Sequence, residues 1–297
     1  MLNKCIILSG ASSKTGLFFL TILSKRKYRR RVFVIVRNNK SKSLFKNFNL
    51  DISFVESDLK KIKSKKYLFP KNSIFLHVAG IPYSLAVLEF CIFNKIKKII
   101  SVHTSGIFSM HKPESKTYKI IDSTFKKKCI THKIFFATLY PTLIFGTGDD
   151  GNISRLIVSL KKFFFFPIIG DGSNFFQPIY YKDLSKAFYL ILENEEKTIK
   201  NKNYILSGKY PISYLEMLKF IQLKTYSKNF FFHIPVRLSV WLINIAIFFY
   251  KSFPINKYQA LRMLENRSFN HSAASLDFKF NPIGFKIGVA RQIKEFF

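Results

Sequence analysis

The chain of 297 residues is 48% hydrophobic and 22% charged, which suits a sizeable core and argues against global disorder. Its formal net charge of +32, from 49 Lys and Arg against 17 Asp and Glu, attracts anions such as nucleotides, nucleic acid or acidic lipid. Because Lys, Asn, Ile and Phe are all inflated, drift in composition explains the same charge, and both causes stay open. The 3 widely separated cysteines argue against a disulfide framework or a zinc site and fit a reducing cytoplasm.

Strand-like apolar runs alternate with helical segments through the first half of the chain. Strands are predicted at 4–10, 31–38, 52–57, 73–80, 97–106 and 133–146, and the first helix at 15–25. Nearly continuous apolar strands with helix-length connections indicate a parallel sheet covered on both faces. The sequence therefore predicts an α/β fold with a Rossmann-type doubly wound sheet. We expect this domain at 1–200, with 151–174 contributing to a smaller, mostly helical C-terminal lobe at 201–297.

The most apolar run, "LSVWLINIAIFFY", extends from Leu238 to Tyr250. It is too short to span a bilayer and contains Asn244, so it predicts a buried or interfacial helix. Arg237 and Lys251 at its ends allow this helix to dock peripherally on a lipid surface.

A glycine-rich turn, "SGASSKTG", follows the first predicted strand and opens the first helix. Gly10 and Gly16 occupy the outer positions of a G-x-x-G-x-x-G loop, and Ser13 occupies the middle one. Small residues there let the backbone approach a pyrophosphate at the helix N-terminus. A tight turn around an empty pocket is the alternative. The predicted dinucleotide contacts in this loop are Gly10, Ser12, Ser13, Thr15 and Gly16.

Arg37 ends the second predicted strand, twenty-one residues after Gly16. An acidic residue at this place would bind a ribose 2′-hydroxyl, whereas an arginine pairs with the 2′-phosphate of NADP. The sequence therefore favours NADP slightly over NAD as the cofactor. Further cofactor contacts are predicted after the third and fourth strands, at Asp58, Leu59, Ala79 and Gly80.

Ser105 precedes Tyr118 by thirteen residues, a spacing that can bring a hydroxyl and a phenol together over a bound cofactor. An enzyme with such a pair usually carries a lysine four residues after the tyrosine, where this chain has Asp122. A carboxylate disfavours a phenolate, so a working pair needs a cation from elsewhere. Pro113 suits a first helical position, and a packed aromatic and a turn residue are the structural alternatives for Tyr118 and Ser105.

Several motifs occur in order along the chain: Gly10-x-x-Ser13-x-x-Gly16, Asp58-Leu59, Val78-Ala79-Gly80, Thr104-Ser105, "YPTLIFGTG", "QPIYYKDLSKAF" and "NYILSGKYPISYLEML". Their combination resembles the extended short-chain dehydrogenase/reductase superfamily. Within it, the chain is most similar to the NAD-dependent epimerase/dehydratase group that acts on nucleotide sugars. The resemblance covers about residues 4–217 and fades in the last third.

This resemblance implies a Rossmann domain, a C-terminal substrate lobe and a nicotinamide cofactor that exchanges hydride with a substrate bound between them. It also implies that Tyr118 exchanges a proton with the substrate, whose oxygen Thr104 or Ser105 holds. The substrate contacts that it implies are Gln177, Tyr140 and Asp183. Tyr140 stands where the family has an arginine, and Asp122 where it has the catalytic lysine.

The sequence thus predicts an NAD(P)-binding, nucleotide-sugar epimerase/dehydratase-like oxidoreductase of polysaccharide or sugar metabolism, and it is compatible with a homodimer. The alternative is a binding module that has lost the chemistry with the lysine and contacts RNA or an acidic membrane surface. The net charge of +32 and the basic run "KRKYRRR" at 25–31 motivate this alternative. A solvated loop is the default interpretation of that run.

Overall fold

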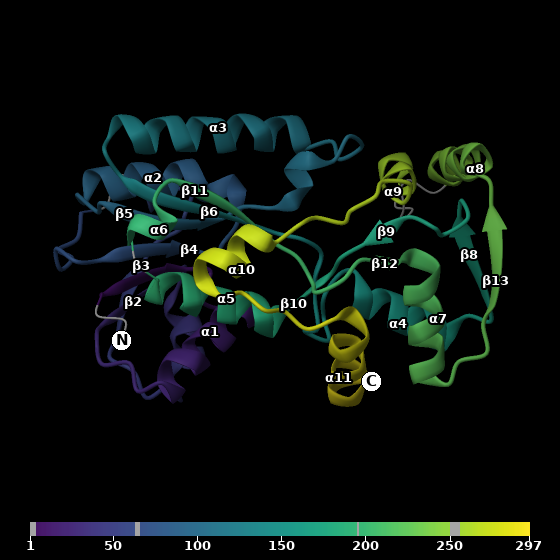
Figure 1. Ribbon diagram of the computed structural model, residues 1–297, viewed down its shortest axis with the longest axis horizontal. Coiled ribbons are helices and arrows are strands. Elements are labelled where there is room, and N and C mark those ends of the chain that lie inside the picture. The colour runs from purple at the N-terminus through teal and green to yellow at the C-terminus, as the bar shows by residue number, and fades with distance from the viewer. Residues whose placement is uncertain (1–3, 63–65, 195, 250–255) are drawn as a thin grey trace.

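The fold is built on one parallel sheet of seven strands (Figure 1). The computed structural model describes residues 4–62, 66–194, 196–249 and 256–297. The strand order is β11-β6-β5-β4-β1-β2-β3, and every neighbouring pair is parallel. The strands are β1 (Ile6–Ser9), β2 (Val32–Val36), β3 (Ile52–Glu56), β4 (Ile74–His77), β5 (Lys98–Val102), β6 (Phe135–Pro141) and β11 (Lys202–Leu206). The order reverses between β1 and β4, where Rossmann-type sheets bind ligands. The predicted α/β fold is therefore confirmed.

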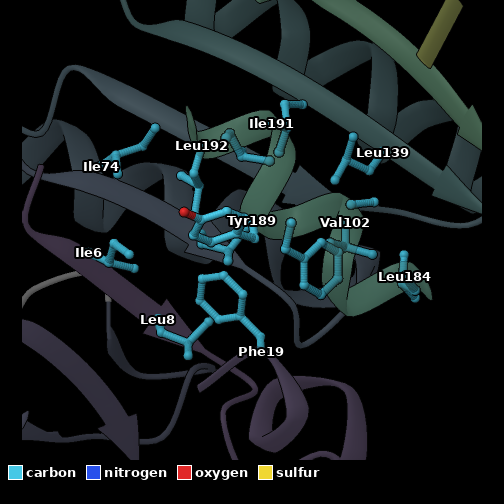
Figure 2. Close-up of a cluster of buried hydrophobic side chains, with 14 of the residues drawn as sticks. Ile6, Leu8, Phe19, Ile74, Val102, Leu139, Leu184, Tyr189, Ile191 and Leu192 are labelled. Atoms are coloured by element: carbon cyan, nitrogen blue, oxygen red, sulfur yellow. The ribbon is translucent and has the colours of Figure 1, made fainter. Parts of the chain in front are cut away.

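Helices cover both faces of this sheet (Figure 1). One face carries α1 (Lys14–Lys25), α5 (Tyr181–Glu193) and α10 (Ser272–Phe278), and the other carries α2 (Ser84–Phe93) and α3 (Ser115–Thr131). Alternate residues of a strand point to opposite faces, so Ile6 and Leu8 join the first core and Ile7 the second. Figure 2 shows the first core, where Leu8, Phe19 and Leu192 gather from β1, α1 and α5. Burial on both faces explains the continuous apolar runs.

The remaining elements form a second lobe with a core of its own, on the right of Figure 1. Its helices are α4 (Ile153–Lys162), α7 (Tyr214–Thr225), α8 (Val236–Phe249), α9 (Lys257–Arg262) and α11 (Phe285–Phe296). Its short strands pair as β8 (Phe165–Ile169) with β13 (Phe230–Ile234), β9 (Phe175–Phe176) with β12 (Ile212–Ser213), and β7 (Ile144–Phe145) with β10 (Ile179–Tyr180). Short helical elements elsewhere are η1 (Asn39–Phe45), η3 (Ile81–Tyr83), η4 (Ser105–Phe108) and α6 (Glu196–Ile199).

Some predicted bounds differ from the observed ones. The run at 133–146 divides into β6 and β7, which belong to different sheets. Helix α3 begins at Ser115 rather than at Pro113. Strand β11 pairs with β6, so the large sheet extends past the boundary expected at residue 200. The division of the chain into two lobes at that residue stays a prediction.

The apolar run at 238–250 forms most of α8, whereas Tyr250 and Lys251 lie outside the described residues. Helix α8 has 14 residues. Within the four described ranges, no helix combines the length and apolarity that crossing a bilayer requires.

Candidate functional site

The glycine loop between β1 and α1 closes tightly around the start of the helix. Ser13 is the N-cap of α1: its hydroxyl accepts from the Gly16 N–H at 3.0 Å and donates to the Gly10 carbonyl at 2.8 Å. A Cβ on Gly10, whose φ is +76°, would lie 2.7 Å from the backbone nitrogen of Ala79. A Cβ on Gly16 would lie 2.5 Å from the Gly10 carbonyl oxygen, so only glycine fits at both positions. The first turn has no acidic residue, and its free N–H groups favour an anion.

The other predicted cofactor contacts stand near the carboxyl ends of neighbouring strands. They are Ser12 and Thr15 in the glycine loop, Arg37 after β2, Asp58 and Leu59 after β3, and Ala79 and Gly80 after β4. Arg37 is exposed and forms no ion pair with another described residue, so its charge is available to a ligand. The loop and the strand ends together fit a dinucleotide whose pyrophosphate faces α1. The individual contacts stay predictions.

The side chain of His77, at the end of β4, forms hydrogen bonds to the end of β1 and to the loop that follows β4. Its Nε2 donates to the Gly80 carbonyl at 2.9 Å, because a carbonyl oxygen can only accept. Its Nδ1 therefore accepts from the Ser9 hydroxyl at 2.7 Å. Burial lowers the pKa of His77 to about 3. The ring is neutral at physiological pH and is a structural group.

A cavity of about 600 Å³ opens between the carboxyl ends of β5 and β6 and the second lobe. Its wall comes from the loop after β5, the segment after β6, and residues 262–269. This volume lies within the range of small-molecule sites. The polar residues of its wall include Ser105, Lys112, Gln177, Arg262, Glu265 and Arg267.

Thr104 and Ser105 line this cavity, whereas Tyr118 is not among its lining residues but lies next to Lys112, which is. The Thr104 hydroxyl accepts from the Gly106 N–H at 3.0 Å and caps η4. Ser105 lines the cavity, and its hydroxyl is not bonded to any other residue that the structure describes. Tyr118 packs against a small buried cluster of Ile81, Ile107 and Tyr140. Burial, followed by the charge of Glu114, raises the pKa of the Tyr118 phenol, so this phenol needs a cation to ionise.

The Asp122 carboxylate bonds to three residues, none of which is Tyr118. It accepts from His103 Nδ1 at 2.7 Å, from Lys126 Nζ at 2.7 Å and from the Tyr140 hydroxyl at 2.6 Å. Burial opposes its ionisation, but these hydrogen bonds outweigh burial and lower the pKa of Asp122 to about 2. Asp122 is therefore an anchor between α3 and the strands β5 and β6.

Ser84, His103 and Asp122 have the connectivity of a hydrolase triad, since the Ser84 hydroxyl lies 3.0 Å from His103 Nε2. Ser84 is fully buried at the start of α2, however, and His103 and Asp122 are buried as well, whereas Tyr118 is partly exposed. A nucleophile must reach its substrate. We therefore interpret this chain of hydrogen bonds as a structural link between α2, β5 and α3.

Lys112 places a cation beside Tyr118. The spacing of residues along the sequence did not predict this neighbour. Its Nζ lies 4.7 Å from the ring centroid of Tyr118, and the residue lines the cavity. A Cβ on Gly106 would stand 3.1 Å from this Nζ, so the glycine leaves room for the ammonium. Burial and the nearby Arg262 lower the pKa of Lys112. Its ammonium forms no ion pair within the described part of the chain.

Glu265 fixes the loop that carries Lys112. Its carboxylate accepts from the Ser109 hydroxyl and from the backbone N–H of His111, each at 2.7 Å. The Ser109 hydroxyl in turn accepts from the backbone N–H of Lys112 at 2.9 Å. A buried carboxylate of the second lobe thus orients a loop that follows β5.

Two arginines of the second lobe add positive charge to the cavity wall. The Nε atoms of Arg262 and Arg267 are buried without a hydrogen-bond partner among the described residues, and neither guanidinium forms an ion pair there. The Arg267 guanidinium lies 4.0 Å from the ring centroid of Phe176. Burial and the charge of Arg262 lower the pKa of Arg267 to about 10, so it stays charged at neutral pH. Unpaired cations in a cavity wall indicate an anionic ligand.

The three residues predicted to contact the substrate lie in different surroundings. Gln177 lines the cavity, but its amide bonds to the backbone at two points, at 2.7 and 2.8 Å. Tyr140 is bonded to Asp122 and does not line the cavity. Asp183 is buried and accepts a backbone N–H from the segment before α11 at 2.8 Å. These bonds brace the cleft, and substrate contact by the three stays a prediction.

The basic run at 25–31 forms the turn from α1 to β2. Its lysines and arginines are exposed, but Tyr28, its one aromatic, is buried and donates to the Lys4 carbonyl. The run therefore offers no aromatic face on which a base could stack, which favours a solvated loop.

Similarity to solved structures extends over nearly the whole chain. A UDP-glucuronic acid 4-epimerase from Bacillus cereus, in complex with UDP-glucuronic acid and NAD, is 16% identical with a TM-score of 0.71 over 98% of this chain and 99% of that one. A UDP-glucose 4-epimerase from Thermotoga maritima, with UDP-glucose, is 14% identical with a TM-score of 0.66 over 98% and 97%. A dTDP-glucose 4,6-dehydratase from Bacillus anthracis, in complex with NAD, is 13% identical with a TM-score of 0.69 over 98% and 96%. No family model and no curated protein matches the sequence. The predicted resemblance to these epimerases and dehydratases is confirmed at the level of the fold.

Proposed function

We propose that the chain is a nicotinamide-dinucleotide-dependent oxidoreductase of the epimerase/dehydratase class that acts on a nucleotide sugar. The observation that carries this proposal is the cavity in which Ser105 and Lys112 share a wall with Arg262 and Arg267, neither of which forms an ion pair with a described residue. A nucleotide sugar has an anionic diphosphate for the guanidinium groups and sugar hydroxyls for the smaller polar groups. The ligands of the similar solved structures support the same substrate class.

The glycine loop is the proposed pyrophosphate site, and Arg37 the proposed contact to the ribose or its 2′-phosphate. The arginine favours NADP, whereas the similar structures that contain a cofactor contain NAD. When bound, the nicotinamide would accept a hydride from a substrate carbon and return it.

In this proposal two side chains of the protein act on the substrate: one transfers a proton, and the other holds the substrate oxygen. The Tyr118 phenolate oxygen takes the proton of the substrate hydroxyl as that carbon is oxidised, and gives it back as the carbonyl is reduced. Ser105 donates to the same substrate oxygen. The Lys112 ammonium, over the ring of Tyr118, stabilises the phenolate and so replaces the lysine that is absent at position 122.

Cofactor binding and turnover test this function separately. NADH and NADPH are titrated into the purified protein, and cofactor turnover is then followed over a panel of UDP- and dTDP-sugars. Tyr118→Phe should abolish turnover while the affinity for the cofactor is kept. Failure to bind either nucleotide would overturn the proposal, and binding without turnover or any effect of Tyr118→Phe would favour the binding module.

A matched pair of arginine variants tests the substrate class. Arg267→Met should raise the Kd of a nucleotide sugar about tenfold or more, because a charged hydrogen bond to the diphosphate is lost. Arg29→Met removes the same charge from the exposed turn at 25–31 and should leave that Kd unchanged. Equal effects of both substitutions would show general charge attraction in place of a diphosphate site.

A further inference from the structure

The strand pair β8–β13 carries an aromatic surface on its outer side. Phe166 and Phe231 point inward and belong to the core of the second lobe. Their neighbours Phe165 and Phe230 face solvent and are 64% and 57% exposed, with ring centroids 6.1 Å apart. The strands of this pair are parallel, and parallel strands are ordinarily covered on both faces. Phe163, Phe164 and Phe232 extend the exposed aromatic surface.

Helix α8, which follows β13, also turns an apolar stripe to solvent. Leu238, Trp241 and Leu242 stand at i, i+3 and i+4 and are all exposed, and Trp241 is 59% exposed. Ser239 and Ile243, on the other side of the helix, are buried. The stripe therefore has no partner among the described residues, although its spacing is that of a buried helix face.

The two apolar surfaces lie at the same end of the molecule, at the right of Figure 1. We call them together the apolar end, which consists of Phe163, Phe164, Phe165, Phe230, Phe232, Leu238, Trp241 and Leu242. No Asp or Glu occurs between Asp150 and Asp171 or between Glu216 and Glu265. Exposed cations accompany the aromatic residues in these segments, namely Lys161, Lys162, Lys228 and Arg237.

We propose that the apolar end docks on an anionic phospholipid bilayer. Aromatic side chains suit the headgroup region, and apolar residues flanked by Lys and Arg are held there by burial together with attraction to acidic lipids. A second copy of the chain would bring together two faces on which exposed cations outnumber acids, since Asp171 after β8 stands against Lys161, Lys162, Lys228 and Arg237, and charge repulsion opposes this. RNA would meet the cations but would leave the leucine stripe exposed. This proposal does not depend on the proposed enzymatic function.

The single tryptophan of the chain, Trp241, reports directly on this contact. With vesicles of phosphatidylcholine that contain about 30% phosphatidylglycerol, we expect its emission to shift to the blue and to be quenched by brominated acyl chains. Phosphatidylcholine alone should give neither effect, and about 0.5 M salt should weaken the binding. Absence of a shift with the anionic vesicles, or an equal shift with both kinds, would overturn the proposal.

Variants at the apolar end separate docking from other associations. The double substitution Phe165→Ser and Phe230→Ser, and separately Leu238→Ser, should lower co-sedimentation with anionic vesicles about tenfold. Leu276→Ser on α10, which packs on the seven-stranded sheet away from β8, β13 and α8, is the matched control: Leu276 is 82% exposed, and the variant should bind as the unaltered chain does. Circular dichroism and the urea midpoint verify that each variant is folded. Unchanged co-sedimentation of the folded variants would refute docking through this end.

Two further outcomes identify a different occupant. A blue shift that grows with protein concentration in the absence of lipid would assign the apolar end to a second copy. A shift on addition of RNA, with no quenching by brominated lipid when vesicles are added, would assign it to nucleic acid. Either result replaces the lipid proposal.

Discussion

Asp122 cannot act as the cation that the resembled family has at this position, but it has a structural role of its own. It occupies the position at which the resembled family carries a lysine, but its three hydrogen bonds hold His103, Lys126 and Tyr140. A buried carboxylate with this many partners is difficult to replace, because removal of the carboxylate leaves every partner without its hydrogen-bond acceptor.

Asp122→Lys should therefore destabilise the chain and should not raise turnover. The substitution leaves the His103 N–H and the Tyr140 hydroxyl without their acceptor and brings two ammonium groups together, at an expected cost of about 3–5 kcal/mol. The free energy of unfolding in urea at neutral pH measures this change. Ser123→Lys, exposed on the same helix, is the control and should change stability little. Unchanged stability of Asp122→Lys would contradict the assigned anchor role.

Buried His77 predicts a loss of stability in acid. Its folded pKa is about 3, whereas that of an unfolded histidine is about 6.5, so between these pH values only the unfolded chain binds the proton. Stability is thus fully present above about pH 6.5 and should fall by about 1.4 kcal/mol per pH unit below it.

His77→Gln isolates this contribution in urea unfolding at pH 7.5, 6 and 5. The variant should be less stable at the highest pH and should lose less on acidification than the unaltered chain. His132→Gln removes an exposed histidine and should follow the unaltered chain. Parallel curves for all three proteins would show that His77 does not titrate in this window.

Lys112 is the residue on which the proposed chemistry most depends. Lys112→Gln should lower kcat about 10- to 100-fold and move the pH profile of kcat to higher pH, because the phenol of Tyr118 loses its neighbouring cation. Cofactor affinity should be kept, and Lys112→Arg should restore part of the rate. Lys119→Gln, exposed one residue after Tyr118, serves as the control. A lower kcat with an unmoved pH profile would argue for a positioning effect alone.

At the scale of elements, the turn from β1 to α1 decides whether a dinucleotide can bind. Gly16→Ala should destabilise the chain by about 1–3 kcal/mol and weaken dinucleotide binding, since the new Cβ would meet the Gly10 carbonyl oxygen at 2.5 Å. Gly151→Ala is the matched control, because a Cβ there meets nothing within 4 Å. Thermal unfolding and nucleotide titration of both variants provide the measurements. Equal behaviour of the two would mean that the loop is less tightly packed than described.

Five of the first six sheet strands could be predicted because burial on both faces makes them nearly continuous apolar runs, and the edge strand β3, of which only Val55 is buried, keeps enough apolar residues to be recognised. Strand β11 could not, since Lys202 and Asn203 at its start are exposed and its pairing with β6 joins segments far apart in the chain. The pairing of β8 with β13 escaped prediction for the same reason. Local periodicity indicates which side chains of a strand are buried, but not with which distant strand that strand pairs.

Only those residues of the candidate site that are close to one another in the sequence could be predicted. The spacing of Ser105 and Tyr118 along the chain singled out a serine that lines the cavity and a tyrosine of α3 that lies next to the lining residue Lys112. Lys112, although local, follows no helical spacing from Tyr118, because it precedes the helix on an irregular loop. Arg267 and Glu265 come from the last third, where no motif marks them, and only the tertiary fold brings them to the wall.

At the scale of the whole molecule, the net charge of +32 acts on stability as well as on partners. Like charges repel one another more strongly in the compact state than in the unfolded one. Moderate sodium chloride should therefore raise the urea midpoint above its value at low ionic strength, because it screens this repulsion. Urea titrations at about 0.01 M and 0.2 M salt measure the effect. A midpoint that falls with salt would mean that attractive ion pairs outweigh the excess charge.

The hydrogen bonds of Glu265 to the Lys112 loop determine when, during synthesis, this loop takes the conformation that the proposed reaction needs. The glycine loop and Tyr118 leave the ribosome well before residue 265, but the lysine loop has no anchor until that carboxylate arrives and the second lobe docks. In the proposed reaction, the Lys112 loop thus takes its working conformation only after synthesis of a carboxylate that lies 154 residues after His111. Activity then depends on the last third of the chain, although the glycine loop and Tyr118 belong to its first half.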